Sequence, residues 1–252
     1  KLASVVSDKG HVAGHNGPGA VMGSKKLKAI AVDRPRRRPA FKDIRRLREM
    51  GQWFTEKKKT DPSSVKEFYW GTIGGIPGGA AANTLPVKNY TTNIFDISPE
   101  KVAKWEKEYI RGNFEPERNP CWGCQAFHCH MLRITEGPYK GEMVEEPEAE
   151  SFSLWGPGIG QTDVASTMVI ANDVERWGMD SNEGGRLMGM VMECYEKGII
   201  NREDTDGLEM TWGNADATRA MLRKIAFREG FGNVLAEGTM RAARLIGGGA
   251  PS

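Results

Sequence analysis

Three of the chain's four cysteines lie within one short segment, Cys121-Trp-Gly-Cys124-Gln-Ala-Phe-His-Cys129. Two thiols with the spacing C-x2-C can reach one metal centre from a single turn of backbone. A third thiol five residues later can close over the same centre. Thiolates are soft ligands that suit iron–sulfur clusters and zinc. The segment therefore predicts a metal centre that needs one further ligand from elsewhere.

The type of metal centre stays open at this point. His128 and His130 flank the third thiol, so a zinc site of the Cys3His type is an alternative to an iron–sulfur cluster. Disulfides are disfavoured, because closely spaced cysteines in a chain without secretory features more often bind metal. Cys194 lies beside Leu187 at helical spacing, which is typical of a small core residue and makes it a weak candidate for the missing ligand.

Carboxylates supply the second group of candidate residues. Five glutamates lie between positions 142 and 150, and most should be solvated. Glu150 directly precedes an apolar segment and is expected to be buried, where a carboxyl group can take part in proton transfer. Glu175 and Asp180 flank Gly178 at a predicted helix end. They have either ordinary helix-end roles or accept hydrogen bonds from a nitrogen-rich ring.

A glycine-rich loop, residues 14–19, lies between two β-prone runs at 5–6 and 29–32. Glycines let backbone N–H groups approach a ligand closely, so the loop could contact phosphate. The Walker and dinucleotide-binding patterns are both absent. A hairpin with a wide turn is the alternative interpretation.

The elements that must position these groups are mostly helical. Apolar periodicity, an N-cap at Ser98-Pro99 and glycines after basic last turns predict the boundaries of six helices. A basic, proline-bounded stretch marks a domain boundary near residue 35. We expect a mainly α fold with a short N-terminal β segment, as a β-rich domain end at 1–35 and a helical domain at 36–252. The predicted helices are 41–51, 99–111, 162–177, 182–197, 215–228 and 234–245.

Composition narrows the class of protein. The chain has 252 residues, of which 39% are hydrophobic and 27% charged, so it should form a real core. A net charge of +2 argues against a protein that mainly coats nucleic acid. No apolar run reaches the ~18 residues of a membrane span, and no signal peptide is visible, so a cytoplasmic location is expected. The first residue is Lys1 and the last residues resemble a loop, which predicts a piece of a longer protein.

Taken in order, the motifs resemble the aldehyde ferredoxin oxidoreductase family of tungsten-pterin enzymes. The resemblance covers nearly the whole chain, from the end of the family's β-rich first domain through most of its helical second domain. The segment Gly-Ala-Val-Met-Gly-Ser-Lys is highly specific for the family. The matching motifs are the glycine loop and its continuation at 14–30, LPVKNY at 85–90, the cysteine segment, PEAE at 147–150, GMD at 178–180 and LAEG at 235–238.

The resemblance implies a tungsten, sometimes molybdenum, held by two pyranopterins, with a [4Fe-4S] cluster close by. Typical members oxidise aldehydes to carboxylic acids and pass electrons to ferredoxin, whereas one branch reduces aromatic acyl-CoA esters. The family's cluster motif is C-x2-C-x3-C with a distant fourth cysteine. Cys121 and Cys124 match it. The third position falls on His128, and Cys129 follows one residue later; we favour Cys129, because clusters prefer thiolate. The fourth ligand is expected beyond Ser252.

The resemblance also assigns the pterin contacts. The family's D-x-x-G-L-D motif corresponds to Glu175, Gly178 and Asp180, with Glu175 reaching through a longer arm. His15, Asn16 and Gly17 fall where the family meets the pterin phosphates and a bridging Mg²⁺, and His15 replaces an arginine by a pH-dependent cation.

The remaining motif implies the proton-transfer residue. The family's P-E-Y-E is PEAE here, so Glu150 matches the glutamate beside the metal, and Ala149 in place of tyrosine reshapes the pocket. The expected function is aldehyde oxidation with electron transfer to ferredoxin or partner subunits. The alternatives are an aromatic acyl-CoA reductase and, from another class, a non-catalytic zinc-stabilised helical protein.

Overall fold

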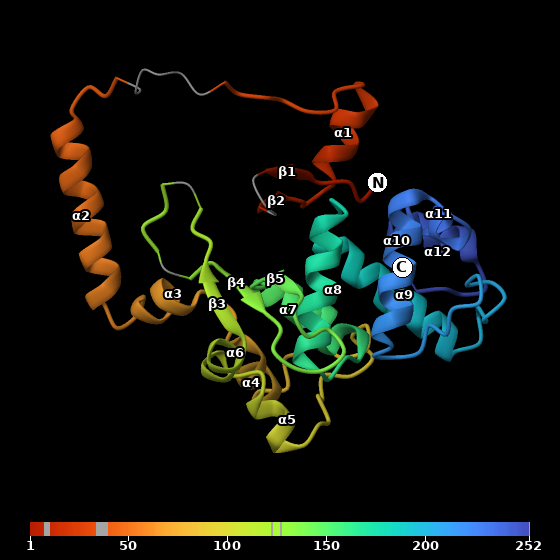
Figure 1. The fold of residues 1–252 in the computed structure, drawn as a ribbon. Coiled ribbons are helices and arrows are strands. Elements are labelled where there is room, and N and C mark those ends of the chain that lie inside the picture. Colours follow the sequence, from red (N-terminus) through yellow and green to blue (C-terminus); the bar gives the residue numbers. More distant parts are fainter. Residues whose placement is uncertain (8–10, 34–39, 122, 127, 252) are drawn as a thin grey trace.

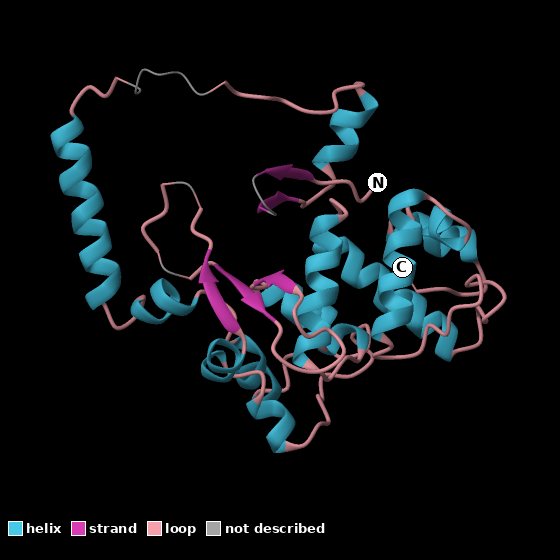
Figure 2. Cartoon of the chain, in the orientation of Figure 1, coloured by secondary structure: helices cyan, strands magenta, loops and turns pink. Residues whose placement is uncertain are grey.

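The computed structural model describes residues 1–7, 11–33, 40–121, 123–126 and 128–251. Helices dominate, with a few short strands (Figure 2). This confirms the predicted fold class. The elements are β1 (Val5–Ser7), β2 (His11–Ala13), α1 (Pro18–Ser24), α2 (Ile44–Thr60), α3 (Val65–Trp70), α4 (Gly75–Ala81), α5 (Pro99–Ala103), α6 (Lys107–Asn113), β3 (Glu115–Arg118), β4 (His130–Arg133), β5 (Met143–Glu145), α7 (Ala149–Trp155), the 3-10 turn η1 (Pro157–Ile159), α8 (Val164–Arg176), α9 (Ser181–Glu196), α10 (Ala215–Phe227), α11 (Phe231–Leu235) and α12 (Thr239–Ile246).

The C-terminal helices form the larger core. α8, α9 and α10 lie close to their predicted positions, and their apolar faces pack together with α11 and α12 (Figure 1). Caps fix the helix starts: Asp163 accepts a hydrogen bond from Ser166 N at 2.8 Å, and Asn214 accepts one from Ala217 N at 3.1 Å. Cys194 is fully buried in this core, as its spacing predicted.

The connection from α8 to α9 is a tight, well-defined turn. Gly178 has φ +66°, and Met179 N donates to Val174 O at 3.0 Å while Gly178 N donates to Glu175 O at 2.9 Å. These two bonds are a Schellman motif, which satisfies the last carbonyls of α8. Asp180 then caps α9, accepting from the backbone N–H groups at 182 and 183. The predicted helix stop at Gly178 is confirmed.

A second core lies under the three-stranded antiparallel sheet β3-β4-β5. The register pairs Leu132 of β4 with Pro116 of β3 and Val144 of β5. Leu132 and Val144 are fully buried, and so is Trp105, whose ring packs on Phe152 of α7 at 4.8 Å between centroids. Sequence reasoning did not predict these strands, because each has only three or four residues and lacks clear alternation.

The N-terminal hairpin β1–β2 lies against the α8–α9 turn (Figure 1). Ser4 N donates to Gly178 O at 2.8 Å, and Asp180 N donates to Leu2 O at 2.7 Å. The prediction of a strand over 29–32 is wrong: the segment has no partner strand in the described part of the chain, and Val32 is 87% exposed. The glycine loop therefore connects β2 to α1, not one strand to another.

Three predicted helices have different bounds. The helix over 41–51 starts at Ile44 and continues through Gly51 to Thr60, because Gly51 has open space around it and helix-forming residues follow. The helix over 99–111 is divided into α5 and α6, because Trp105 turns into the core and Glu106 has extended backbone. The helix over 234–245 is interrupted at Gly238, whose φ is +87°.

The boundary near residue 35 falls within 34–39, outside the described residues, and stays a prediction. The interval 71–95 lies outside the six predicted helices, yet it contains the short helix α4. Among the described helices, none combines the length and apolar character of a membrane span.

Candidate functional site

Three cavities adjoin one another between the cysteine segment and the α8–α9 turn. We call them the cysteine cavity (about 270 Å³), the central cavity (about 440 Å³) and the glycine-loop cavity (about 400 Å³). Glu148 and Glu175 line both the cysteine cavity and the central cavity. His15 and Asp180 line both the central cavity and the glycine-loop cavity. The cysteine cavity is lined by residues that include His11, Cys121, His128, Cys129, Glu145 and Glu175.

The glycine loop meets the start of α9 at the glycine-loop cavity. Asn16 N donates to Asp180 Oδ2 at 3.2 Å, across 164 residues of sequence. Gly17 has φ +63°, and a Cβ there would lie 2.2 Å from Lys1 O, so only glycine fits. The structure thus brings the predicted cofactor residues His15, Asn16, Gly17 and Asp180 to one cavity wall.

Two arginines at the glycine-loop cavity escaped sequence reasoning. Arg186 of α9 and Arg241 of α12 both line it. Arg241 lies 3.7 Å from Glu237, whereas Arg186 forms no ion pair within the described part of the chain. Guanidinium groups bind phosphate well, so this wall suits an anionic ligand. Arg186 lies three residues after Glu183, which also lines this cavity. This i, i+3 spacing on a predicted helix places both residues on one face and could have identified Arg186 from the sequence.

Carboxylates meet where the cysteine and central cavities join. Burial, followed by the nearby Glu145 and Glu148 carboxylates, raises the pKa of Glu175 to about 8. Burial also raises the pKa of Glu145, which the neighbouring His11 partly offsets from 3.7 Å. A half-buried carboxyl group that titrates near neutral pH can both accept and release a proton.

The expectation that Glu150 is buried is wrong for this structure. Glu150 is exposed in the first turn of α7, because the side of that turn that faces the core carries Ser151 and Phe152. Glu148, two residues earlier, lines the cysteine and central cavities, and its carboxylate accepts a hydrogen bond from Thr72 Oγ1 at 2.5 Å. The carboxylates that the fold gathers are therefore Glu145, Glu148 and Glu175.

Two of the three clustered thiols share the cysteine cavity. Cys121 and Cys129 are half-buried, and Cys124 is exposed on the same loop, where Cys124 N donates to Cys121 O at 3.1 Å. Burial, followed by the adjacent Cys121 thiol, raises the pKa of Cys129 to about 12. Cys121 Sγ lies 3.4 Å from His11 Nε2. Metal binding would have to displace the thiol protons, as thiolate ligation always does.

The donor set of this segment suits an iron–sulfur cluster or a zinc site. The Cys121 and Cys129 thiols are adjacent in the cavity, and Cys124 is exposed on the same loop. Cys194 lies in the helical core and is not part of this site. His128 and Cys129 both line the cavity, so the choice of third ligand stays a prediction.

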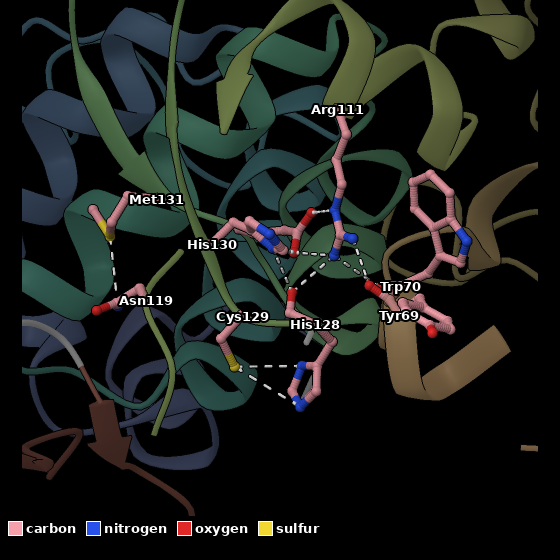
Figure 3. A network of polar contacts seen from close by, with 9 residues as sticks. Tyr69, Trp70, Arg111, Asn119, His128, Cys129, His130 and Met131 are labelled. Carbon is pink, nitrogen blue, oxygen red and sulfur yellow. Dashed lines mark hydrogen bonds and ion pairs between the residues drawn. The ribbon is translucent and has the colours of Figure 1, made fainter. Parts of the chain in front are cut away.

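A buried polar network supports the segment that carries the third thiol (Figure 3). Arg111 donates two bonds to Glu146 at 2.7 and 2.8 Å, and one to His128 O at 2.8 Å. His130 Nδ1 also lies 3.0 Å from His128 O. Sequence reasoning treated Arg111 as an ordinary last-turn residue, and nothing local signals contacts that depend on the packing of α3, α6 and β5.

Comparisons with known proteins agree with this geometry. The family model described as "Aldehyde ferredoxin oxidoreductase, domains 2 & 3" matches residues 49–252, and that of the same family's N-terminal domain matches residues 1–34. A tungsten-containing aldehyde ferredoxin oxidoreductase of Pyrococcus furiosus is 32% identical over 257 residues, covering 98% of this chain and 40% of the relative.

Two further proteins are similar to this chain. The WOR-like subunit of an aliphatic sulfonate oxidoreductase of Pyrococcus furiosus is 29% identical over 247 residues, covering 98% of this chain and 38% of the relative. The active-site complex BamBC of benzoyl coenzyme A reductase, solved with 1,5-dienoyl-CoA, superposes with a TM-score of 0.73 at 23% identity, covering 99% and 38% of the two chains. At that identity the superposition shows a shared fold. The chain spans about two fifths of the length of these proteins.

Proposed function

The chain belongs to the aldehyde ferredoxin oxidoreductase family, and from that premise we propose that it forms part of a tungsten- or molybdenum-dependent oxidoreductase that converts aldehydes to carboxylic acids. The observation that carries the proposal is the junction of three cavities, where the glycine loop and Asp180 lie on one side and the cysteine segment on the other. A pterin-bound metal and a cluster both find donor groups of the right chemistry there.

The proposed cofactor contacts follow the cavity walls. His15, Asn16 and Gly17 would meet the pterin phosphates and their Mg²⁺, and Asp180, Gly178 and Glu175 would contact a pterin from the α8–α9 turn. Cys121, Cys124 and Cys129 would hold a [4Fe-4S] cluster, with a fourth ligand from outside this chain. When bound, the pterin-held metal supplies the two-electron chemistry, and the cluster delivers electrons singly to ferredoxin or a partner subunit.

Proton transfer falls to the carboxylates. Oxidation of an aldehyde with water yields a carboxylic acid, two electrons and two protons, so the site needs groups that accept protons. We propose Glu175, which lines the junction with its pKa near 8, and Glu150, which the family motif places beside the metal. Glu175 can also contact the pterin while it holds a proton.

The fold match to the benzoyl-CoA reductase complex favours a second candidate function. In that case the same site would reduce an aromatic acyl-CoA thioester with low-potential electrons. Ala149, in place of the family's tyrosine, is the half-buried first residue of α7, and its small side chain is compatible with a larger substrate.

The test begins with elemental analysis of the full-length protein. We expect tungsten or molybdenum together with iron, and turnover of an aldehyde panel but not of aryl-CoA esters. Turnover of the esters alone would favour the second function. Zinc without tungsten, molybdenum or iron would overturn both and favour a zinc-stabilised helical protein.

Three variants then assign the carboxylates. Glu175→Gln and Glu150→Gln should each lower kcat by about 100-fold or more with metal content unchanged, because general acid–base groups contribute on that scale. Glu117→Gln, an exposed residue on β3, is the matched control and should have no effect. Wild-type kcat in either test variant removes that glutamate from the mechanism.

A further inference from the structure

We propose that Arg111 is the positioning residue of the cysteine segment: its guanidinium fixes the backbone that carries Cys129 and compensates the buried Glu146 carboxylate beside the cluster. This inference rests on the proposed function, because it assumes a cluster at Cys121, Cys124 and Cys129. It adds a residue outside the cysteine motif, on a different helix, to the apparatus that determines how the cluster is held.

Arg111 forms an ion pair with Glu146, the residue directly after β5. Its Nε and Nη2 atoms donate to the two carboxylate oxygens of Glu146 at 2.7 and 2.8 Å, in the paired geometry that planar guanidinium and carboxylate groups favour. The side chains are 13% and 4% exposed, respectively. A pair this buried has few alternative conformations, so the guanidinium plane has a fixed orientation.

The same guanidinium then holds the cysteine segment. Nη2 donates to His128 O at 2.8 Å (Figure 3). That carbonyl belongs to the peptide that leads into Cys129, so the bond fixes the peptide's orientation and, through it, the direction of the Cys129 side chain. From the opposite side, Asn119 N donates to Cys129 O at 3.0 Å. Two successive carbonyls of the segment are therefore held by donors from different elements.

A third attachment joins Arg111 to the wall of the cysteine cavity. Nη1 donates to Tyr69 O at 2.5 Å, and Nη2 lies 3.5 Å from Trp70 O, at the end of α3. The guanidinium carbon lies 4.9 Å from the centre of the Trp70 ring. Trp70 lines the cysteine cavity. The Arg111 side chain therefore links the Trp70 wall of that cavity to the backbone that carries Cys129.

Charge gives Arg111 a second effect that a purely structural residue would lack. A reduced cluster carries one more negative charge than an oxidised one, and hydrogen bonds and nearby charge both tune cluster potentials. The Arg111 guanidinium offsets the Glu146 carboxylate, so removing the guanidinium alone leaves an unpaired negative charge near Cys129, which should disfavour the reduced form. Lysine at this position would keep the charge but lack the planar fork that reaches three segments at once.

The experiment compares Arg111→Lys and Arg111→Gln in the full-length holoprotein. Arg111→Lys should change the electron paramagnetic resonance spectrum of the reduced cluster and speed iron loss to a chelator about 10- to 100-fold, the usual scale for residues that orient metal ligands. Arg111→Gln should do the same and also lower the midpoint potential. The matched control is Arg133→Gln on β4, whose ion pairs with Glu115 and Glu117 are at the surface.

A further variant distinguishes a loss of folding from a loss of cluster positioning. Arg111→Gln leaves Glu146 without its partner, so the double variant Arg111→Gln/Glu146→Gln, which keeps an uncharged amide pair, serves as the folded reference with unchanged net charge. Its potential should stay near that of the wild type, whereas its iron loss to the chelator should be faster. Helical circular dichroism of each variant establishes that it is folded.

The possible outcomes distinguish a failure of the proposed function from a failure of this inference alone. A wild-type protein that binds no iron–sulfur cluster would overturn the proposed function and this inference with it. A wild-type cluster whose spectrum and chelator resistance are unchanged in Arg111→Lys and in the double variant would overturn the inference alone. Equal changes in Arg133→Gln would also overturn it, because they would show a general effect of removing an arginine.

Discussion

The helical core of α8–α12 and the cysteine segment, residues 121–129, are stabilised in different ways. The helices bury continuous apolar faces, and residues such as Ile170, Leu187 and Met221 are inaccessible to solvent. The cysteine segment buries no large side chain among its described residues and is held by directed bonds from Arg111 and Asn119. Apolar packing tolerates many sequences, whereas directed bonds require particular residues at particular places.

This contrast predicts how far through the structure the effect of a substitution should extend. A defect in the helical core lowers the free energy of unfolding of the whole unit, because its residues share one packed interior. A defect beside the cysteine segment should change the local geometry of the thiols and leave most of the helices intact. Three substitutions test this division.

The largest effect is expected from Trp155→Ala in α7. Trp155 is fully buried, its Nε1 donates to Ser181 Oγ at 2.9 Å, and it packs against Gly184. Truncation should lower the free energy of unfolding by about 3–5 kcal/mol, as cavity formation at buried aromatic residues does. Urea unfolding followed by circular dichroism measures it.

The control is Trp53→Ala, whose side chain is 66% exposed on α2 and should cost no more than about 0.5 kcal/mol. Equal losses in the two variants would contradict the view that the helical core carries the stability.

A smaller and more local effect is expected from Gly71→Ala. Gly71 has φ +60°, and a Cβ there would lie 3.0 Å from both Cβ and Nδ1 of His128. The strain should cost about 1–3 kcal/mol and displace the cysteine segment. Alkylation of Cys121 and Cys129 in the metal-free protein should become faster, with little change in helical signal.

Gly78→Ala is the matched control, because that glycine lies in α4 with open space around it. Alanine should be neutral or slightly stabilising there. Unchanged thiol reactivity in Gly71→Ala would show that the segment does not depend on this close approach.

The smallest effect concerns pH. Because the pKa of Glu175 is about 8 in the folded protein and near 4.5 when unfolded, the folded form binds the extra proton between these values. Stability from this group is therefore present below about pH 4.5 and is lost as pH rises towards 8. Glu175→Gln cannot ionise and should lose less stability over that range. After discounting for solvent screening, we expect a difference on the order of 1–2 kcal/mol.

Thermal unfolding at pH 5 and pH 8.5 measures this difference, with Glu117→Gln as the exposed control. Parallel melting temperatures for wild type and Glu175→Gln at the two pH values would show that Glu175 is ionised in the folded protein as freely as in water.

The sequence predicted the helical region well for a physical reason. In α8, α9 and α10, apolar periodicity, side-chain caps and terminal glycines all indicate the same boundaries, so local and tertiary preferences agree. Where local and tertiary preferences disagree, the prediction was wrong. Trp105 interrupts an apparently continuous helix because its side chain is buried in the core. The strands β3–β5 are too short to show an alternating pattern.

The sequence predicted several residues that line the adjoining cavities, but it did not predict how they meet. Family motifs identified His15, Asp180 and the cysteines, yet only the fold shows that the glycine loop and Asp180 touch. The exposure of Glu150 and the raised pKa of Glu175 depend on which way a turn faces and on neighbouring carboxylates. Arg111 contacts carbonyls 17 and 42 residues away, a distance over which no periodicity operates.

The bond from Asn16 to Asp180 has a consequence for biosynthesis. The two residues are 164 positions apart, so at typical elongation rates the ribosome makes the second roughly 10–30 s after the first. During that interval the glycine loop has no partner with which to form a cavity. The proposed cofactor, if it contacts both walls, can be inserted only after α9 has emerged, so its loading would be a late event in the synthesis of the chain.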